Sequence, residues 1–157
     1  MKKLLKRLVP IGLFTAAVPY WHWSKAVFYQ VRGGFPARSI QVIGVTGTDG
    51  KTSTSTIITQ MLRSSGKKVA MMSTISVDYG DGRGPQDNPT RLTTIDTKDL
   101  VRVLQKLKAD NVEHLVLEVT SHALHQRRVW GIPFTLAVFT NLGHEHLDYH
   151  RTFERYR

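Results

Sequence analysis

The segment Gly-Val-Thr-Gly-Thr-Asp-Gly-Lys-Thr at residues 44–52 constrains the fold of this chain more than any other. It follows the apolar run at residues 40–43 and precedes a stretch that is compatible with a helix. A buried strand, a glycine-rich turn and Lys-Thr at a helix start are typical of a phosphate-binding loop. In such a loop, backbone N–H groups and the positive end of the helix face the phosphate oxygens. The sequence therefore predicts a nucleotide site inside an α/β domain.

The spacing of this loop differs from the general pattern G-x-x-x-x-G-K-[ST], because Val45 stands where the first glycine would be. The extra glycine is Gly47, and together with Gly50 it allows backbone conformations that a side chain would block. A glycine-rich hairpin followed by a chance Lys-Thr is the alternative. The order of strand, loop and helix favours the phosphate loop, in which Lys51 reaches the terminal phosphates and the Thr52 hydroxyl takes a Mg²⁺ ion.

The rest of the chain alternates between strand-like and helix-like segments. Four apolar runs predict buried strands: residues 39–45, 68–75, 113–119 and 134–140. Four segments predict helices: residues 52–64, 96–109 with Asp96 as the cap, 121–127 with Ser121 as the cap, and 149–157. A long polar loop is expected at residues 77–94. This alternation predicts an α/β fold with a mostly parallel sheet and flanking helices, and ligands bind such sheets at the carboxyl ends of the strands.

Composition limits the remaining possibilities. The 157 residues are enough for one domain with a core, and the absence of cysteine excludes disulfides and thiolate metal sites. The net charge is +10, but seven of the 22 basic residues precede Asp49, the first acidic residue. The rest of the chain contains 15 basic and 12 acidic residues. The positive charge therefore belongs to an N-terminal arm, residues 1–38, and we expect no nucleic-acid partner.

The arm combines a lysine-rich start with the apolar run at residues 8–18. A signal peptide or a membrane span is disfavoured by Pro10, Pro19 and Lys25, and no clean cleavage site follows. Its tryptophans and basic residues are compatible with weak association of residues 1–31 with an anionic membrane surface. The other alternative is a helical arm packed on the domain or on a partner domain. Residues 33–36, Gly-Gly-Phe-Pro, mark the boundary before the domain at residues 39–157.

Two further segments carry candidate ligands. Glu118 ends an apolar strand, and a carboxylate there is costly unless it meets a cation. It is a candidate Mg²⁺ ligand, and a capped or salt-bridged glutamate is the alternative. Residues 141–150 contain three histidines, two acids and Asn141, which raises the question of a zinc site. The spacing is not H-E-x-x-H, so one histidine completing the shell of a nucleotide-bound Mg²⁺ is favoured over zinc.

Several motifs in the order found here are similar to those of the Mur ligases, particularly the members that add the third residue of the peptidoglycan stem peptide. Beyond the phosphate loop, the matching motifs are Leu-Thr-Thr at 92–94, Leu-Glu-Val-Thr-Ser-His-Ala-Leu at 117–124, Gln-Arg-Arg-Val at 126–129, Val-Phe-Thr-Asn-Leu at 138–142 and Glu-His-Leu-Asp-Tyr-His at 145–150. The resemblance covers about residues 39–157. In this chain Thr120 stands where the family usually has Ser, and Ile95 replaces a usual Pro.

The resemblance implies roles for individual residues, with ATP and Mg²⁺ as cofactors. The ATP site would comprise Thr46, Gly47, Thr48, Asp49, Gly50, Lys51, Thr52 and Asn141. The metal ligands would be Thr52, Glu118 and His146, and the residues acting in catalysis Lys51, Glu118 and His146. The substrate contacts would be Thr93, Thr94, Thr120, Gln126 and Arg128.

The implied activity is ATP-dependent addition of an amino acid to UDP-MurNAc-dipeptide in the cytoplasm, through an acyl phosphate. A folylpolyglutamate-synthase-like ligase and an ATP-binding module without catalysis are the alternatives. By this comparison the arm replaces a uridine-binding N-terminal domain. Residues 39–157 are then the N-terminal part of the central ATP-binding domain, and a C-terminal domain is expected in addition. We therefore expect this chain alone to be inactive as a ligase.

Overall fold

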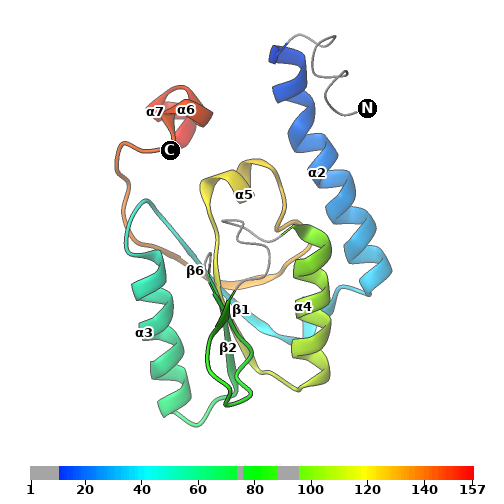
Figure 1. Ribbon diagram of the computed structural model, residues 1–157, viewed down its shortest axis with the longest axis vertical. Coiled ribbons are helices and arrows are strands. Elements are labelled where there is room, and N and C mark those ends of the chain that lie inside the picture. The colour runs from blue at the N-terminus through cyan, green and yellow to red at the C-terminus, as the bar shows by residue number, and fades with distance from the viewer. Residues whose placement is uncertain (1–10, 74–75, 88–95) are drawn as a thin grey trace.

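A six-stranded sheet forms the centre of the computed structural model, which describes residues 11–73, 76–87 and 96–157 (Figure 1). The strand order is β4-β3-β2-β5-β1-β6. The strands are β1 (Gln41–Thr46), β2 (Val69–Met72), β3 (Ser76–Asp78), β4 (Gln86–Asp87), β5 (His114–Glu118) and β6 (Phe134–Phe139). The strands β2, β5, β1 and β6 pair in parallel, whereas β3 and β4 pair antiparallel at one edge. The expected α/β fold with a mostly parallel sheet is confirmed.

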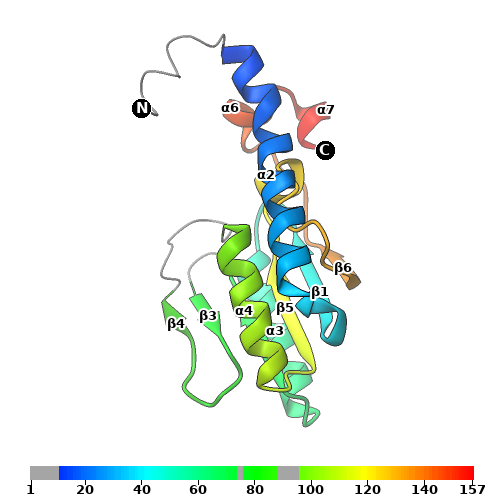
Figure 2. The same ribbon diagram turned by 90° about the vertical axis from the view of Figure 1, so that its right-hand side faces the viewer.

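Helices cover both faces of this sheet. They are α2 (Ile11–Gly33), α3 (Lys51–Ser64), α4 (Thr97–Ala109), α5 (Ser121–His125), α6 (Leu147–His150) and α7 (Phe153–Tyr156), with a 3₁₀ turn at Pro36–Ser39. Helix α3 lies on one face and α4 on the other, and α2 packs outside α4 (Figures 1 and 2). The short helices α5, α6 and α7 gather at the end where the parallel strands finish (Figure 1).

The core is split by the sheet into two layers, because alternate side chains of a strand point to opposite faces. In β5, Leu115 and Leu117 join the cluster beneath α4, whereas Val116 joins the smaller cluster beneath α3. Helix α4 contributes a stripe of three fully buried leucines, Leu100, Leu104 and Leu107. This is the apolar face that the helical spacing predicts.

The segment expected as a polar loop at 77–94 is where the fold departs most from prediction. Residues 76–78 and 86–87 form β3 and β4, which extend the sheet in the antiparallel sense. Because both strands are very short and glycines separate them, they carry no recognisable alternating pattern. Residues 79–85 join these strands without helix or strand, as expected for a loop, and residues 88–94 lie outside the described residues.

Helix ends also differ from the predictions. Thr120 rather than Ser121 caps α5, since its Oγ1 accepts a hydrogen bond from Ala123 N at 3.2 Å. Asp96 does occupy the N-cap of α4, but its carboxylate makes no capping bond and instead binds Lys25 Nζ at 2.7 and 3.0 Å. The helix expected at 149–157 is divided into α6 and α7, with Arg151 between them in the left-handed region (φ 69°).

In the described part of the arm, residues 11–33 form helix α2, which packs against α4. Ala26 and Gln30 are completely buried there, and Trp23 meets Trp130 edge to face with ring centroids 6.4 Å apart. None of the helices in the described ranges is both long enough and apolar enough to cross a membrane. The arm is therefore anchored on the domain through its inner face.

Candidate nucleotide and metal site

The carboxyl ends of the parallel strands bring the predicted site residues to one edge of the sheet. Register pairs Val45 of β1 with Glu118 of β5, and Thr46 with Phe139 of β6. A cavity of about 370 Å³ opens at this edge. Its lining residues are Thr48, Asp49, Gly50, Lys51, Thr52, Ser53, Glu118, Thr120 and His146. Most of the residues expected to bind ATP or metal thus surround a single cavity.

Glycine is required in the loop because of its conformation and its close approach to β6. Gly47 has φ 136°, and a Cβ at this position would lie 2.1 Å from Thr140 Oγ1 and 2.9 Å from Asn141 O. Gly50 has φ 76° and stands at the N-cap of α3, with open space where a Cβ would be. The first glycine lets the loop pass against the neighbouring strand end, and the second leaves room in front of the helix.

The loop is held by the segment that follows β6. Thr48 N donates to Asn141 O at 3.0 Å, and Asp49 N donates to Asn141 Oδ1 at 2.9 Å. The Asp49 carbonyl in turn accepts from Thr140 Oγ1 at 2.7 Å and from Asn141 Nδ2 at 3.1 Å. Asn141, expected among the ATP-binding residues, thus uses its amide to fix the loop backbone. A direct contact between Asn141 and nucleotide remains a prediction.

Lys51 begins α3 and folds back over its own loop. Its Nζ donates to the carbonyls of Gly47 at 2.7 Å and Thr48 at 2.5 Å. The first N–H groups of a helix have no intrahelical partner, and α3 has no acidic residue in its first turn to occupy them. The positive end of α3 and the Lys51 ammonium therefore face the same cavity, which suits an anion.

The three expected metal ligands reach the cavity from different elements. Thr52 lies in the first turn of α3, Glu118 ends β5, and His146 precedes α6. Glu118 is only 4% exposed, and a buried carboxylate is favourable only beside a cation or donors. Hydroxyl and carboxylate oxygens suit Mg²⁺, and the adjoining helix end suits the phosphates that accompany it. These residues fit a nucleotide-bound Mg²⁺, and their roles stay predictions.

The histidines of residues 144–150 pack against other aromatic rings, and not against one another as a compact ligand set. His146 meets His122 edge to face, with ring centroids 4.9 Å apart, and His122 also packs on Tyr149 at 4.0 Å. Within the described ranges, no group of three or more His, Asp or Glu side chains is arranged to hold a metal ion.

The expected substrate contacts are divided between two places. Thr120 lines the nucleotide cavity, and Gln126 is buried and donates from Nε2 to Tyr149 Oη at 2.9 Å. Arg128 is half-buried near Asp96, and burial lowers the pKa of its guanidinium below the ordinary value. Thr93 and Thr94 lie outside the described residues. The structure therefore leaves the substrate roles as predictions.

Sequence reasoning missed two residues that shape the loop. Thr140 binds the carbonyl oxygens of Asp49 and Thr46, and Tyr156 Oη lies 2.8 Å from Thr48 Oγ1. Thr140 could have been found, because it directly follows a strand of the parallel sheet, where ligand-binding loops start. Tyr156 has no such signal, because its contact depends on how the chain returns through α6 and α7.

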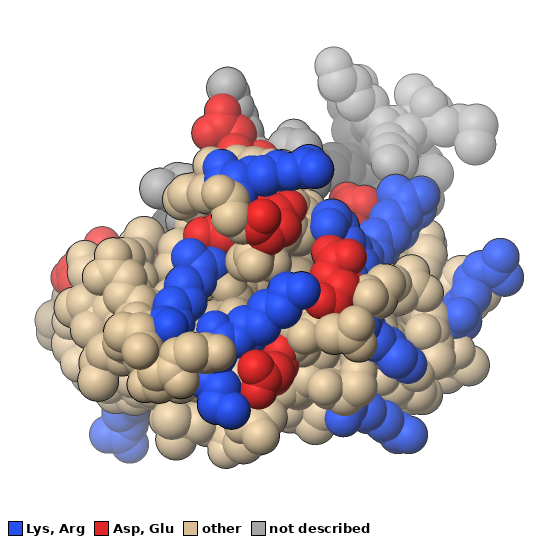
Figure 3. Space-filling view, turned by 90° about the horizontal axis from the view of Figure 1, so that it is seen from below, with Lys and Arg blue, Asp and Glu red and all other residues tan. Residues whose placement is uncertain are grey.

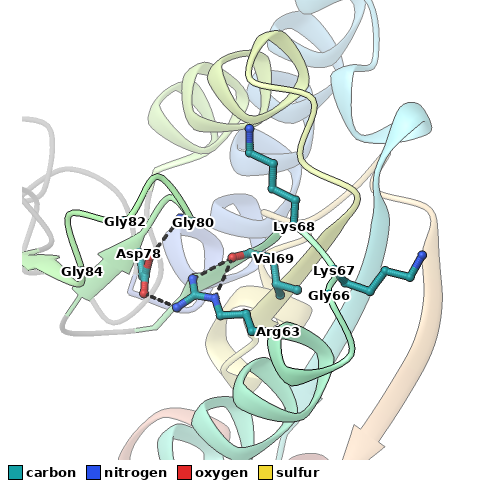
Figure 4. A pocket seen from close by; sticks show the side chains of 9 residues that line it. All are labelled: Arg63, Gly66, Lys67, Lys68, Val69, Asp78, Gly80, Gly82 and Gly84. Atoms are coloured by element: carbon teal, nitrogen blue, oxygen red, sulfur yellow. Dashed lines mark hydrogen bonds and ion pairs between the residues drawn. The ribbon is translucent and has the colours of Figure 1, made fainter.

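A second cavity, of about 480 Å³, lies at the opposite, amino end of the strands (Figure 4). Its basic side chains already have partners. Arg63 binds Asp78 Oδ2 at 2.8 Å and the Val69 carbonyl at 2.7 Å, while Lys67 and Lys68 point away toward Glu113 and the Asp110 carbonyl. We assign no ligand to this cavity, although it is the larger of the two.

Comparison with known proteins agrees with this arrangement. The profile of the Mur ligase middle domain matches residues 45–157. UDP-N-acetylmuramoyl-L-alanyl-D-glutamate–2,6-diaminopimelate ligase of Geobacillus thermodenitrificans is 40% identical over 152 residues, which cover 97% of this chain and 30% of that protein. UDP-N-acetylmuramyl-tripeptide synthetase of Treponema pallidum is 39% identical over 153 residues, or 94% of this chain and 27% of that protein.

A solved structure of a UDP-N-acetylmuramoyl-L-alanyl-D-glutamate–2,6-diaminopimelate ligase superposes with a TM-score of 0.61 and 34% identity, covering 74% of this chain and 23% of that one. The chain thus spans less than a third of the length of these relatives. Since the middle-domain profile matches most of the chain and the fold agrees, the chain belongs to the Mur ligase family.

Proposed function

We propose that this chain is the ATP-binding part of a ligase that adds an amino acid to UDP-MurNAc-dipeptide in peptidoglycan synthesis. Residues 1–38 form its arm and residues 39–157 its ATP-binding domain. The observation that carries the proposal is the cavity at the carboxyl edge, where the phosphate loop, Lys51, Glu118 and His146 meet. Relatives named for this ligation in Geobacillus thermodenitrificans and Treponema pallidum support the substrate class.

ATP binds with its phosphates between the loop and the start of α3. The N–H groups of Gly50 to Ser53 donate to the phosphate oxygens, and the helix end adds its positive potential. Lys51 turns from the Gly47 and Thr48 carbonyls toward the terminal phosphates. Thr46 and Asp49 complete the loop, and Asn141 supports its backbone.

Thr52, Glu118 and His146 would hold Mg²⁺ in this cavity. When bound, the ion would offset negative charge on the transferring phosphoryl group. In this role Glu118 acts as a metal ligand and not as an acid or base, and an ionised carboxylate is the form that binds a cation. Its position at the end of β5 is fixed by the pairing with β1, so the ligand is preorganised rather than recruited from a loop.

The reaction consists of two nucleophilic displacements, and the protein positions the reactants for each. The dipeptide carboxylate attacks the γ-phosphorus, the bond to ADP breaks, and an acyl phosphate forms. The amine of the incoming amino acid then attacks the acyl carbon, phosphate leaves, and the amine loses a proton as the amide forms. Thr93, Thr94, Thr120, Gln126 and Arg128 would orient the UDP-MurNAc-dipeptide, with the Arg128 guanidinium suited to a carboxylate or phosphate.

The cytoplasm is the compartment proposed for this reaction, because ATP and the nucleotide-linked substrate are soluble there. An ATP-binding module without catalysis is the second candidate. The observation that favours it is the composition of the cavity, which is lined by the expected nucleotide and metal residues but not by Gln126 or Arg128, two of the expected substrate contacts. Correct positioning can account for roughly 7–11 kcal/mol of a reaction barrier, so a module that does not hold the second substrate would ligate at a near-background rate.

A chimera separates the two candidates. Residues 39–157 replace the matching segment of the Geobacillus thermodenitrificans relative, and the purified chimera is given ATP, Mg²⁺, UDP-MurNAc-dipeptide and a panel of amino acids that includes 2,6-diaminopimelate. We expect amino-acid-dependent tripeptide formation, which the Lys51→Ala chimera loses. If the folded chimera binds ATP and makes no tripeptide, the ligase proposal is rejected and the non-catalytic ATP-binding module is retained.

A further inference from the structure

Helix α2 has two chemically different faces. The inner face is fixed to the domain, because Ala26 and Gln30 are buried against it and Lys25 Nζ lies 2.7 Å from Asp96 Oδ2. Trp23 also packs against Trp130 on this side. The helix is therefore held in one orientation on the domain, and its opposite face is presented in a defined direction.

The outer face is an apolar stripe. Tyr20, Trp21, Phe28 and Val31 are 64%, 66%, 60% and 61% exposed. Their spacing places them on one side of the helix, one to three turns apart. In Figure 2 this helix faces the viewer, and none of the described helices or strands covers it. Exposed Ser24 lies between Trp21 and Phe28 on this side, so the face is mainly and not wholly apolar. A mainly apolar face of this kind on a folded domain marks an interaction surface.

Positive charge accompanies the stripe. Arg32 is exposed at its C-terminal end, and the Arg127 guanidinium lies 5.7 Å from the centre of the Tyr20 ring. Four more basic residues precede α2 in the sequence, and no acidic residue occurs before Asp49. The end of the domain opposite the phosphate loop differs, because basic and acidic side chains intermingle there (Figure 3).

We propose that the outer face of α2 docks on an anionic lipid surface, with Tyr20, Trp21 and Phe28 at the level of the headgroups. Aromatic and aliphatic side chains beside unbalanced cations are the composition of an interfacial helix. A second copy of the chain is disfavoured as the occupant, because two such faces would bring the same positive charge together. The helix lies along the lipid surface, because its inner face stays packed on the domain.

This docking leaves the nucleotide cavity open. The cavity lies at the carboxyl edge of the sheet, between α3 and the ends of β1 and β5. Helix α2 lies on the other side of the sheet from α3, where it packs against α4, and its N-terminal part extends beyond α4 toward the end where α5, α6 and α7 gather (Figures 1 and 2). The inference therefore does not rest on the proposed ligase function. Thermal denaturation followed by circular dichroism shows whether each variant is folded.

Vesicle flotation tests the proposal on the full chain, with vesicles of phosphatidylcholine alone or mixed with phosphatidylglycerol. We expect binding only to the anionic vesicles, weakened by added salt. The double substitution Trp21→Ser and Phe28→Ser should reduce the partition coefficient by about ten-fold or more. Arg32→Gln should reduce it by about five-fold, the effect of one cation near such a surface.

The matched control substitutes two side chains of similar exposure on the other side of the domain. Ile57 and Met61 of α3 are 57% and 64% exposed, and Ile57→Ser with Met61→Ser should leave vesicle binding unchanged. Equal binding of the wild type and the Trp21/Phe28 variant would overturn the proposal. So would equal binding to neutral vesicles, or self-association through this face in place of vesicle binding.

Discussion

Substitution of Gly47 by Ala should damage the phosphate loop far more than the same change at another glycine of left-handed conformation. The new Cβ would lie 2.1 Å from Thr140 Oγ1, over 1 Å closer than carbon and oxygen normally approach. Rotation of Thr140 alone does not relieve the clash, because Asn141 O and N lie 2.9 and 3.0 Å away. The strand end and the loop must therefore separate.

The magnitude follows from three contributions. An alanine held at φ 136° costs about 1–3 kcal/mol, and loss of the Thr140 Oγ1 to Asp49 O hydrogen bond costs about 1 kcal/mol. Displacement of Asn141 weakens two further loop contacts. The free energy of unfolding should fall by about 3 kcal/mol or more, which lowers the melting temperature by about 6–12 °C in a chain of this size.

Gly82→Ala is the matched control, because Gly82 has φ 82° and open space around the missing Cβ. It carries the conformational cost without the clash, and it lies outside the nucleotide cavity. Thermal denaturation followed by circular dichroism gives both stabilities, and titration calorimetry gives the affinity for Mg·ATP. If Gly47→Ala has the same melting temperature as Gly82→Ala and binds Mg·ATP with the same affinity, the packing argument for this loop is incorrect.

Three other substitutions and one control probe separate contacts. Lys51→Ala should weaken ATP binding by about ten-fold or more, the effect of one charge-assisted bond, and the chain should stay folded although its bonds to the Gly47 and Thr48 carbonyls are lost. The control Lys67→Ala, at an exposed ion pair, should leave the affinity measured by calorimetry unchanged. Tyr156→Phe removes one hydrogen bond to the loop and should lower the free energy of unfolding in urea by about 1 kcal/mol. Burial raises the pKa of Asp78, but hydrogen bonds from Arg63 and a backbone N–H outweigh it and hold that pKa below 3.8. The ionised Asp78 carboxylate therefore stabilises the fold above pH 3.8, and this stabilisation is lost as pH falls through the lower pKa of the folded state. The difference in free energy of unfolding between wild type and Asp78→Asn should shrink in acid. A difference that does not change with pH would contradict this.

The sequence predicted the sheet well where strands are long and apolar. The strands β1, β5 and β6 and the helices α3 and α4 begin and end within about two residues of their expected bounds. Burial on both faces explains the strong apolar signal of β1 and β5, whereas β6 is an edge strand that is apolar in sequence although most of its residues are exposed. The antiparallel strands β3 and β4 were missed because they are short. Pairing of β3 with β2 and of β4 with β3, and not local pattern, decides their conformation.

The candidate site shows the same division. Ligands bind parallel sheets at the carboxyl ends of the strands, and this rule was enough to predict that the phosphate loop, Glu118 and the segment after β6 lie at one edge of the sheet. The rule could not predict that Asp96 turns from its helix end to Lys25, because that pairing joins residues 71 positions apart. The hydrogen bond between Thr48 and Tyr156 could not be predicted for the same reason, because the two residues are 108 positions apart and local sequence does not indicate their contact.

Titration of ATP into the chain, with Mg²⁺ and then with EDTA, tests the central claim most directly. If loop, Lys51, Thr52, Glu118 and His146 form one Mg·ATP site, the wild type binds ATP at a single site and binds it more weakly without Mg²⁺. Glu118→Gln keeps the shape of the side chain and removes its charge, so it should bind ATP in EDTA as the wild type does and lose the enhancement by Mg²⁺. Absence of ATP binding by the folded wild type, or an undiminished Mg²⁺ enhancement in Glu118→Gln, would contradict the account.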